Sequence, residues 1–597
     1  MTPKTECAEA PVRGWLAAFE SALSRRETET AGALFLPDGE WRDILAFTWS
    51  LGSVSGRRGI VAQLESTIAT TQPANLRIDP VRTRPRWVMR GGTSTLEAFF
   101  RFDTAFGRGN GVLRLVPDER TPDQFRAWTL STLLQELTGH EESVGRRRPS
   151  GPSALRDFGS ENWLDHRRRA AAFEDRDPDV LVIGGGQAGL SIAARLGTLG
   201  VDTLVVERNA RIGDNWRNRY HSLTLHNEVY VNDLPYLPFP PSFPVYLSKD
   251  KLANWLESYA DAMDLNCWTD TAFGSGAYDD KAGRWRVEVQ RGDGTRRRMS
   301  PRHLVLAVGA SPASRIPKLP GLGSFAGQLM HSERYATGAS WRGRKVLVLG
   351  SGTSGHDVAQ DLTACGARVT MIQRGPTYVV SLQEAQRVYS AYAEGLPTEE
   401  CDLLGTSYPH QALLRAYRAA TAESTRNDRA LLDQLAATGF RLDLRPDDTG
   451  FQPRYFGRGG GYYFNVGASN LIIEGKIGLI QYGDIERFVP AGVLLRNGHI
   501  AEAELLVLAT GYLTQQEVVR KLLSDEIADR VGPVWGLAAD GELRNMWTRT
   551  PQPGLWFHAG SLPQCRIYSR FLALQIKACL EGLIPAAAAH PACAGAS

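Results

Sequence analysis

The sequence has few cysteines and lacks the spacings that cysteine-based sites require. Its seven cysteines are dispersed over 597 residues, and no two of them form a C-x-x-C pair. Without such pairs the sequence gives no support to a structural zinc site or to dithiol redox chemistry, and we expect no metal. A sparse, odd set of cysteines is typical of a reducing compartment, so we expect a cytoplasmic protein.

The chain also lacks a strong charge of either sign and any long apolar run. Lys and Arg total 68 and Asp and Glu total 65, which leaves a formal net charge of +3. This balance removes the electrostatic argument for nucleic acid as a partner. No run reaches the ~18 apolar residues of a membrane span, and the first residues lack the apolar core of a secretion signal. We therefore expect neither a membrane span nor a nucleic-acid partner.

Glycine is the residue that the chain has in excess, with 60 of 597 residues. Proteins average about 7% glycine, and an excess without low complexity indicates tight turns and close backbone approaches, as in nucleotide-binding folds. The sharpest break in composition is GRRRPSGPS at residues 145–153. We interpret it as the start of an exposed linker that spans residues 145–177; the alternative is a long surface loop. Helices followed by consecutive strands precede this break and predict an α+β domain at residues 1–144.

The first glycine-rich loop reads GGGQAG and follows an apolar strand at residues 180–183. Gly184 permits the tight turn, Gly186 lets the backbone approach a pyrophosphate, and Gly189 lets helix and strand pack closely. Glu207 follows Gly184 by 23 residues, at the end of the next strand, where an acid accepts hydrogen bonds from a ribose diol. The pattern predicts a site for FAD or NAD, to which we also assign Gln187 and Arg208.

The second glycine-rich loop reads GSGTSG and supplies Gly350, Gly352, Thr353, Ser354 and Gly355. The position that corresponds to Glu207 holds Gln373, and Arg374 comes next. Loss of the acid removes the repulsion of a ribose 2′-phosphate, and a guanidinium pairs well with that phosphate, so the pattern favours NADPH. The alternative for Arg374 is an exposed arginine at a strand end. Because Gly375 offers the phosphate no second group, we also hypothesise that NADH is tolerated.

Three further segments resemble the flavin-containing monooxygenases. Residues 213–240 resemble the segment after the FAD loop of that family, and ATGY at residues 509–512 resembles a second family element. The family fingerprint F-x-G-x-x-x-H-x-x-x-Y is matched by Phe325, Gly327, His331 and Tyr335. Baeyer–Villiger monooxygenases typically carry Trp at the last of these positions. A core of this kind behind an N-terminal extension resembles the second subgroup of the family, whose members can oxidise ketones and accept NADH.

The N-terminal extension has a resemblance of its own. The segments GEWRDILAFTW and GRRGIVAQL, within residues 39–64, resemble the nuclear-transport-factor-like (polyketide-cyclase-like) cone fold. That fold packs helices against a curved sheet and often encloses a pocket, which Trp41, Arg42 and Asp43 could line. The alternative is a salt-bridged turn with a packing Trp. The resemblance leaves open whether this domain shapes substrate access or forms a homodimer.

The resemblances together imply an α/β fold with two Rossmann-like dinucleotide-binding domains, for FAD and NADPH, behind a small α+β cone-like domain. The predicted order is the cone-like domain at 1–144, the linker at 145–177 and the first part of the FAD domain at 178–335. The NADPH domain follows at 336–490, with a helical insertion at 383–450, and the second part of the FAD domain occupies 491–597.

The family resemblance also implies a reaction. NADPH reduces FAD, dioxygen forms a flavin hydroperoxide, and one oxygen atom is inserted into a small organic substrate. The products are those of Baeyer–Villiger oxidation of ketones, of S- or N-oxygenation, or of both. The alternative enzyme is a flavin-dependent NADPH oxidase or reductase that releases hydrogen peroxide. The non-enzymatic alternative is a nucleotide-binding interaction protein.

Site residues carried over from the family lie mainly after the first loop. Trp216 and Arg217 match positions near the flavin, with packing and a surface pair as the alternative. His226 and Asn227 fall where the family places polar groups close to the reactive flavin edge, and Asn227 is the catalytic candidate. The alternatives are that Asn232 takes this place or that Asn227 forms a turn.

The resemblance also assigns residues in the later segments. His331 is the fingerprint histidine, and we expect it to couple domain position to catalysis without transferring a proton to substrate. Thr510 and Gly511 are assigned to cofactor binding and are expected in a strand that joins the two dinucleotide-binding domains. Near the end of the chain, a helix N-terminus is expected close to the flavin, with the neighbouring cofactor-binding side chains Gln564, Arg566 and Ser569.

Overall fold

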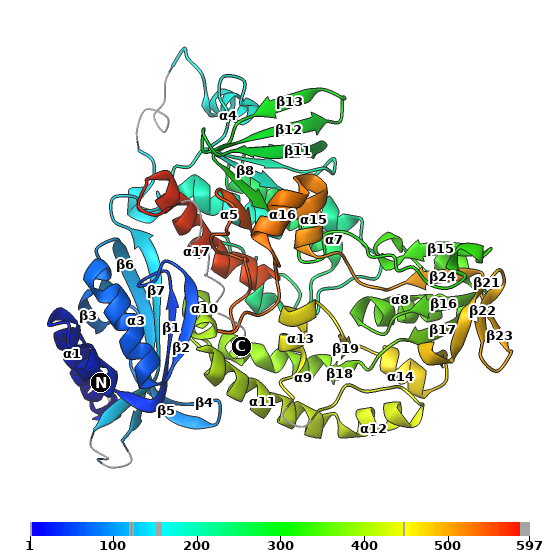
Figure 1. Ribbon diagram of the computed structural model, residues 1–597, viewed down its shortest axis with the longest axis horizontal. Coiled ribbons are helices and arrows are strands. Elements are labelled where there is room, and N and C mark those ends of the chain that lie inside the picture. Colours follow the sequence, from blue (N-terminus) through cyan, green and yellow to red (C-terminus); the bar gives the residue numbers. More distant parts are fainter. Residues whose placement is uncertain (1–2, 119–120, 122–123, 151–157, 446–447, 586–597) are drawn as a thin grey trace.

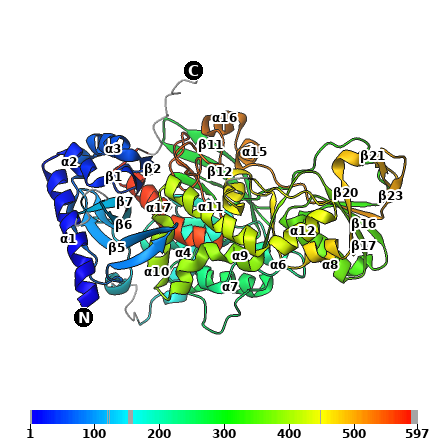
Figure 2. The same cartoon turned by 90° about the horizontal axis from the view of Figure 1, so that it is seen from below.

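The computed structural model describes residues 3–118, 121, 124–150, 158–445 and 448–585, with the side chains of residues 3–7 left out. Three units lie side by side, an α+β unit and two units that are each built on a parallel sheet (Figures 1 and 2). The predicted fold class is therefore confirmed. Parts of the predicted linker and of the C-terminal segment, residues 151–157 and 586–597, lie outside the described residues.

The N-terminal unit packs helices against a seven-stranded sheet of order β2-β1-β7-β6-β5-β3, with β4 paired to β5. Trp15 and Phe19 stack at 4.8 Å on the buried side of the first helix, as the helical spacing of apolar residues predicts. The likeness to the nuclear-transport-factor-like fold stays a prediction. The elements are α1 (Pro3–Ser24), α2 (Thr28–Ala33), β1 (Phe35–Ile44), β2 (Leu51–Ser55), α3 (Gly56–Thr71), β3 (Ala74–Ile78), β4 (Arg86–Arg90), β5 (Thr93–Asp103), β6 (Gly107–Pro117) and β7 (Phe125–Leu137).

The two faces of this sheet have different neighbours. Successive side chains of a strand point to opposite faces, so Trp41 and Asp43 face the helices of the same unit, whereas Arg42 faces away from them. The Trp41 indole donates to Thr132 Oγ1 at 2.9 Å, and Asp43 accepts from the same hydroxyl at 2.6 Å. Both side chains are fully buried in the packed interior, while Arg42 pairs with Glu542 far along the chain. The hypothesis that these three residues line one pocket is therefore wrong.

Later parts of the chain cover the outer face of the same sheet. Glu40 accepts from the backbone N–H of Ala412 at 3.1 Å, and Arg570 donates to Gln135 at 2.7 Å. The helices that contact this face are α10 (Thr398–Thr406), α11 (His410–Asn427) and α17 (Leu562–Leu580), which lie next to the N-terminal unit in Figure 1. This face is therefore not open to a second copy of the chain.

The first dinucleotide-binding unit has a parallel sheet of order β10-β9-β8-β14-β25. Its strands are buried on both faces, which explains their continuous apolar sequences. The last strand comes from the C-terminal part of the chain, as the split FAD domain predicts. The elements are β8 (Val180–Ile183), α5 (Gln187–Thr198), β9 (Thr203–Val206), α6 (Asp214–Arg217), α7 (Lys249–Ala262), β10 (Cys267–Trp268), β14 (His303–Leu306) and β25 (Leu555–Phe557), with the antiparallel β11 (Thr271–Asp279), β12 (Arg284–Arg291) and β13 (Arg296–Met299) beside them.

The second parallel sheet has the order β15-β24-β16-β17-β20. Its first two strands pair His331 with Leu508, and both lie outside the predicted limits 336–490. These limits are corrected because the fingerprint segment and the ATGY segment both belong to this sheet. The elements are β15 (Gln328–His331), β16 (Lys345–Leu349), α8 (Thr353–Ala364), β17 (Arg368–Gln373), α14 (Ala468–Ile473), β20 (Ile477–Gln481) and β24 (Leu505–Leu508), with β21 (Ile485–Val489), β22 (Gly492–Leu495) and β23 (Ile500–Glu502) at one edge.

The predicted insertion is helical and runs below the first unit, between the N-terminal sheet and the second unit (Figures 1 and 2). None of the helices among the described residues is long and apolar enough to cross a membrane. The remaining elements are α4 (Trp163–Ala172) within the linker, β18 (Tyr378–Ser381), α9 (Leu382–Gln386), the 3-10 helix η7 (Arg387–Glu394), α10 (Thr398–Thr406), α12 (Arg429–Ala437), α13 (Phe451–Arg458), β19 (Tyr462–Asn465), α15 (Gln515–Leu522) and α16 (Asp525–Val531).

The buried Asp43 predicts a pH dependence of stability. Burial raises its pKa from 3.8 to about 6, against the opposing effect of its hydrogen bonds. The folded state therefore favours the protonated acid, and its stability falls as pH rises from 4 to 7, by about 2 kcal/mol. Asp43→Asn should remove this fall, as measured by urea unfolding at each pH, whereas the exposed Asp38→Asn in the same strand should keep it. A constant difference between wild type and Asp43→Asn across this range would contradict the assignment.

Candidate functional site

The first glycine-rich loop leaves no room for side chains. Gly184 has φ +108°, and a Cβ on it would lie 2.6 Å from the carbonyl oxygen of Ala307. A Cβ on Gly189 would lie 1.8 Å from the carbonyl oxygen of Gly184, so helix α5 touches the loop backbone. Gly186 is the N-cap of this helix, and the free N–H groups of the first turn suit an anionic phosphate. The loop therefore fits the pyrophosphate of a dinucleotide.

Glu207 lies beside this loop, as predicted. Its carboxylate accepts from the Gly185 backbone N–H at 2.7 Å and from the backbone and side chain of Asn209 at 2.8 and 2.7 Å. The carboxylate thus holds the loop at the end of β9, at the position where the ribose of a dinucleotide is recognised in this fold.

A chain of side-chain contacts leads from α5 to the N-terminus of α17. The Trp216 indole donates to Gln187 Oε1 at 3.2 Å, and Gln187 Nε2 donates to the carbonyl oxygen of Gly560 at 3.2 Å. Gln564 Oε1 accepts from the Ser561 backbone N–H at 2.9 Å and closes a capping box. The structure therefore brings together Gln187, Trp216 and Gln564, which the sequence assigned to the cofactor.

Of four further residues expected near the cofactor, three are held by other groups of the protein. Arg217 bonds to Asp214 at 2.8 Å and to Glu257 at 2.7 Å, so it holds α6 against α7, the pairing alternative of the sequence analysis. Arg208 is exposed. Arg566 is paired with Asp402, and the buried Ser569 hydroxyl donates to the Arg566 carbonyl within α17. The side chains of Arg217, Arg566 and Ser569 are thus occupied by the protein itself.

The second loop repeats the geometry of the first. A Cβ on Gly355 would lie 2.0 Å from the carbonyl oxygen of Gly350, which has φ +119°. The N-cap Gly352 has φ −82° and ψ −175°, against −82° and −173° for Gly186. Thr353 Oγ1 donates to the carbonyl oxygen of Tyr462 at 3.1 Å, which ties the loop to β19. Ser354 follows in the first turn of α8.

The two adjacent residues at the end of β17 that were predicted to contact the cofactor ribose have different environments. Gln373 is fully buried, and its amide pairs in both directions with the backbone of Arg441, at 2.9 and 2.8 Å. Its side chain is thus held by the insertion and is not free to bind a cofactor, which corrects that assignment. Arg374 is exposed, and within the described part of the chain its guanidinium has no hydrogen bond or ion pair. It is free to meet a phosphate.

Asn227 lies in the turn before the 3-10 helix at Val229–Val231, and its side chain contacts the insertion. Asn227 Nδ2 donates to the hydroxyl of Tyr389 at 3.3 Å. The buried Asn232 donates to the backbone carbonyls of Asn227 and Glu228, both at 3.1 Å. Asn232 therefore stabilises the turn by bonding to its backbone. Of the two alternatives, Asn227 is the residue whose side chain reaches another element.

His226, which directly precedes Asn227, has a neutral imidazole ring. Its ring lies edge-on to Phe464 at 4.9 Å between ring centroids. The imidazole is accessible to solvent, yet the protein around it lowers its pKa to about 4 by desolvation. Phe464 in turn packs edge-on against Phe451 at 4.6 Å, so an aromatic wall from β19 and α13 stands behind the histidine.

The insertion and α13 contribute tyrosines that the sequence analysis did not assign. The Tyr455 hydroxyl donates to Gln564 Oε1 at 3.1 Å. Burial, reinforced by the neighbouring Tyr462 and Tyr389, raises the pKa of Tyr455 well above its usual value. Burial likewise raises the pKa of Tyr389. Both phenols stay protonated. Tyr455 donates to Gln564 at the α17 N-terminus, whereas Tyr389 accepts from Asn227. Each of these two tyrosines gains its place in the site through a partner far along the chain, Asn227 or Gln564, which the local sequence pattern does not indicate.

His331 joins the fingerprint segment to the ATGY segment. Its Nδ1 accepts from the Glu333 backbone N–H at 3.1 Å, so Nε2 carries the proton and donates to the carbonyl oxygen of Gly511 at 3.0 Å. Thr510 Oγ1 donates to the Arg315 carbonyl at 2.6 Å. Desolvation lowers the pKa of His331, and both ring nitrogens are occupied. This geometry suits a residue that positions segments and does not transfer protons.

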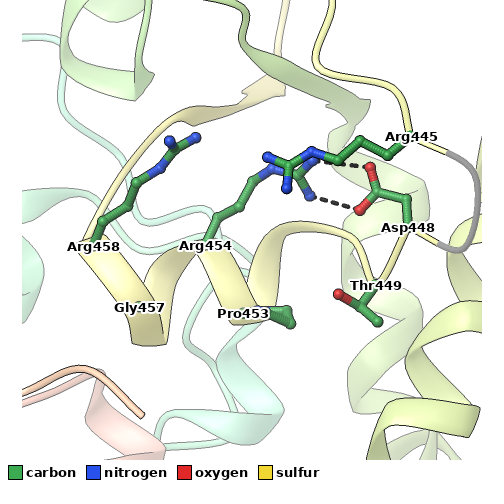
Figure 3. Close-up of a pocket in the computed structure, with 7 residues that line it drawn as sticks. All are labelled: Arg445, Asp448, Thr449, Pro453, Arg454, Gly457 and Arg458. Atoms are coloured by element: carbon green, nitrogen blue, oxygen red, sulfur yellow. Dashed lines mark hydrogen bonds and ion pairs between the residues drawn. The ribbon is translucent and has the colours of Figure 1, made fainter.

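A recess of about 330 Å³ is lined by one face of α13 and by the segment before this helix (Figure 3). Arg454 bonds to Asp448 at 2.7 and 2.9 Å, and Asp443 pairs with Arg445 at 2.9 Å. The acids balance most of the positive charge here, so the recess is an ion-paired support for α13. Its lining residues are Arg445, Asp448, Thr449, Pro453, Arg454, Gly457 and Arg458.

Known proteins match the part of the chain that carries both loops. The sequence model of the family described as flavin-binding monooxygenase-like matches residues 177–515. Indole-3-pyruvate monooxygenase YUCCA1 of Oryza sativa subsp. japonica is 33% identical over 354 residues, which are 58% of this chain and 80% of that protein. Probable indole-3-pyruvate monooxygenase YUCCA4 of Arabidopsis thaliana is 30% identical over 336 residues, which are 56% and 75% of the two chains.

A solved structure has the same fold over about two thirds of the chain. The complex of OTEMO with FAD and NADP superposes with a TM-score of 0.50 at 17% sequence identity. The match covers 68% of this chain and 86% of that chain. At this identity the likeness shows the fold alone.

The close approach at Gly189 predicts a selective loss of the bound dinucleotide. Gly189→Ala forces α5 away from the loop, at a cost of about 1–3 kcal/mol. If the strain falls on the loop, affinity for the dinucleotide drops about 10- to 100-fold. Gly197→Ala in the same helix has free space around it and should stabilise the helix by about 0.5–1 kcal/mol. Absorbance of the purified proteins measures the bound flavin, and equal flavin content in both variants would reject the assignment.

Proposed function

Because the chain belongs to the flavin-binding monooxygenase-like family, we propose that it is a NAD(P)H- and dioxygen-dependent monooxygenase that inserts one oxygen atom into a small organic substrate. One observation carries the proposal. Two equivalent glycine-rich loops are both connected to one group of tyrosines. Thr353 of the second loop donates to the backbone carbonyl of Tyr462, and Gln564, close to the first loop, accepts from the Tyr455 hydroxyl. Two dinucleotides bound at these loops would bring their reactive ends towards the same cluster.

The residues divide between the two cofactors. We assign Gly184, Gly186, Gly189 and Glu207 to FAD, and Gly350, Gly352, Gly355 and Arg374 to NADPH. When bound, FAD supplies the redox chemistry, namely acceptance of a hydride from the nicotinamide and activation of dioxygen. The protein's own contribution is to bind and orient both groups and to exclude water. The aromatic wall of Phe451, Phe464 and the tyrosines serves the last of these functions.

The relatives favour a ketone as the substrate. Two of them are named for indole-3-pyruvate, which carries a ketone. We therefore propose Baeyer–Villiger-type insertion between the carbonyl carbon and a neighbouring carbon. The reaction consumes one ketone, one dioxygen, one NADPH and one proton and yields one ester, one NADP⁺ and one water. S- or N-oxygenation has the same balance, with the oxide as product, whereas an oxidase would convert dioxygen, NADPH and a proton to hydrogen peroxide and NADP⁺.

Product analysis tests this function directly. The purified protein is expected to be yellow, and NADPH should bleach it in the absence of air. A ketone and a sulfide offered together in air should give ester in preference to sulfoxide, as measured by mass spectrometry against NADPH consumed. Sulfoxide alone would shift the proposal to heteroatom oxygenation. Peroxide equal to the NADPH consumed with every substrate would establish the oxidase instead, and a protein that binds no flavin would reject both.

Arg374 is predicted to select the phosphorylated nicotinamide cofactor. Its charge-assisted contacts with a ribose 2′-phosphate are worth about 1.5–3 kcal/mol. Arg374→Ala should therefore raise the KM for NADPH about 10- to 100-fold and change that for NADH less than about twofold. Steady-state consumption of each cofactor measures the effect, with Arg368→Ala at the other end of β17 as the control. An equal rise for NADPH and NADH would assign the phosphate contact to another residue.

A further inference from the structure

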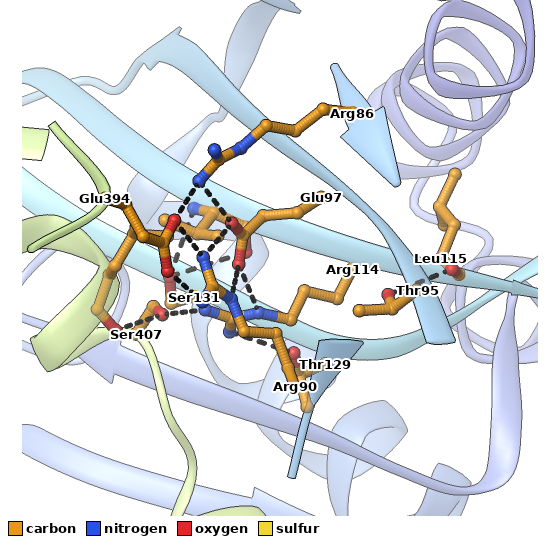
Figure 4. Close-up of polar contacts among 12 residues, drawn as sticks. Arg86, Arg90, Thr95, Glu97, Arg114, Leu115, Thr129, Ser131, Glu394 and Ser407 are labelled. Carbon is orange, nitrogen blue, oxygen red and sulfur yellow. Dashed lines mark hydrogen bonds and ion pairs between the residues drawn. The ribbon is translucent and has the colours of Figure 1, made fainter. Parts of the chain in front are cut away.

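A network of arginines and glutamates joins the N-terminal unit to the insertion (Figure 4). Within the N-terminal sheet, Glu97 accepts from Arg114 Nε at 2.9 Å and from Arg90 Nη2 at 2.8 Å. Arg90 and Arg86 each reach across to Glu394, at 2.6 Å. Glu394 is the last residue of η7, so the N-terminal unit holds this end of the insertion directly.

The part of the network that lies within the N-terminal sheet is buried. Glu97 and Arg114 are 2% and 0% exposed, and Arg114 also donates to the hydroxyl of Ser407 at 2.8 Å, just after α10. Burial alone would raise the pKa of Glu97, but the guanidiniums of Arg114 and Arg90 lower it below its usual value. Removal of one partner would leave a buried charge without compensation, so the geometry of this contact is strongly specified.

The 3-10 helix η7 also contacts Asn227 and, through Asp402, helix α17. Tyr389 lies five residues before Glu394 and accepts the hydrogen bond from Asn227 at 3.3 Å. The Tyr392 hydroxyl donates to Asp402 at 2.5 Å, and Asp402 is paired with Arg566 of α17 at 2.6 and 2.9 Å. A single short segment therefore connects the N-terminal unit to the predicted catalytic asparagine.

The Tyr389 hydroxyl has an unused proton. It accepts from Asn227, and among the residues that the structure describes its own O–H has no acceptor. Burial raises its pKa, so the phenol remains protonated near neutral pH. A partly buried O–H beside Asn227 that lacks an acceptor is suited to donate to an oxygen of a bound molecule.

We propose that Tyr389 orients the substrate by donating a hydrogen bond to its carbonyl oxygen, and that the N-terminal unit sets the position of this phenol through Glu394. The inference rests on the proposed function and names the substrate class as one with an acceptor oxygen next to the bond that is oxidised. Tyr389 is a substrate-binding residue in this scheme. Arg86, Arg90 and Glu394 are positioning residues, and the N-terminal unit is a working part of the site.

Tyr389→Phe tests the hydrogen bond, because it removes one oxygen and keeps the ring. The dissociation constant of a ketone, measured from the perturbation of the flavin spectrum, should rise at least tenfold, and the fraction of NADPH lost to peroxide should increase. The rate of anaerobic flavin reduction by NADPH should stay within twofold. An unchanged dissociation constant would overturn the role of Tyr389. A loss of binding together with a loss of flavin reduction would also overturn it, because that result indicates general damage.

Glu394→Gln tests the positioning role. Amide hydrogen exchange over residues 382–408 should accelerate at least tenfold, and the dissociation constant of the ketone should rise in the same direction as in Tyr389→Phe. Asp433→Asn is the matched control, since Asp433 is paired with Arg429 inside α12 and makes no contact between units. If Glu394→Gln fails to fold, Arg86→Gln replaces it, because the Glu97–Arg90 pair then stays intact. Unchanged exchange in the variant that folds would overturn the positioning role.

Failure of the proposed function gives a different result. A wild-type protein that makes only peroxide with every ketone and sulfide would reject the monooxygenase assignment. In that case ketone binding and amide exchange still decide whether Tyr389 and Glu394 have the proposed roles. If wild type binds no ketone at all, the inference is overturned together with the function.

Discussion

The site depends on two contacts in which a helix backbone touches the loop that precedes it. At Gly189 and Gly355 an added Cβ would come within 1.8 and 2.0 Å of a carbonyl oxygen, so a side chain is excluded at both positions. Because the two helices start so close to the preceding strands, their N-termini lie at the carboxyl ends of the strands of the two parallel sheets. The tyrosines, Asn227 and the start of α17 are arranged around the space that these two helix ends define.

Much of this arrangement was predictable from the sequence, because it depends on local pattern. The glycines of both loops, the acid at Glu207 and the apolar strands before them have fixed spacings along the chain, and the structure places all of them as expected. The strand order was not predictable in the same way. The short segment β15 pairs with β24, about 180 residues away, and that pairing moved the limits of the second unit.

Side chains whose partners are distant in sequence were the other source of error. Gln373 was assigned to a cofactor by its position, but the backbone of Arg441, 68 residues later, occupies its amide. Arg217 stands at a family position, yet its guanidinium is paired with Glu257 of the next helix. The pattern of one strand or loop gives no information about such partners. Tyr389 and Tyr455 were missed for the same reason, since each acquires its meaning only through Asn227 and Gln564.

The ion pair between Arg42 and Glu542 spans 500 residues of sequence. The N-terminal sheet ends at Leu137, about 400 residues before Glu542, so at about 5–20 residues per second this unit waits roughly 20 to 80 s before that partner leaves the ribosome. Until α10, α11 and α17 have been made, the outer face of its sheet is open to water. Glu40, Arg42, Glu97 and Arg114 on that face are well hydrated while alone, whereas an apolar surface of the same size would invite aggregation. The charged character of this contact thus lets an early domain remain soluble until the chain that covers it has been made.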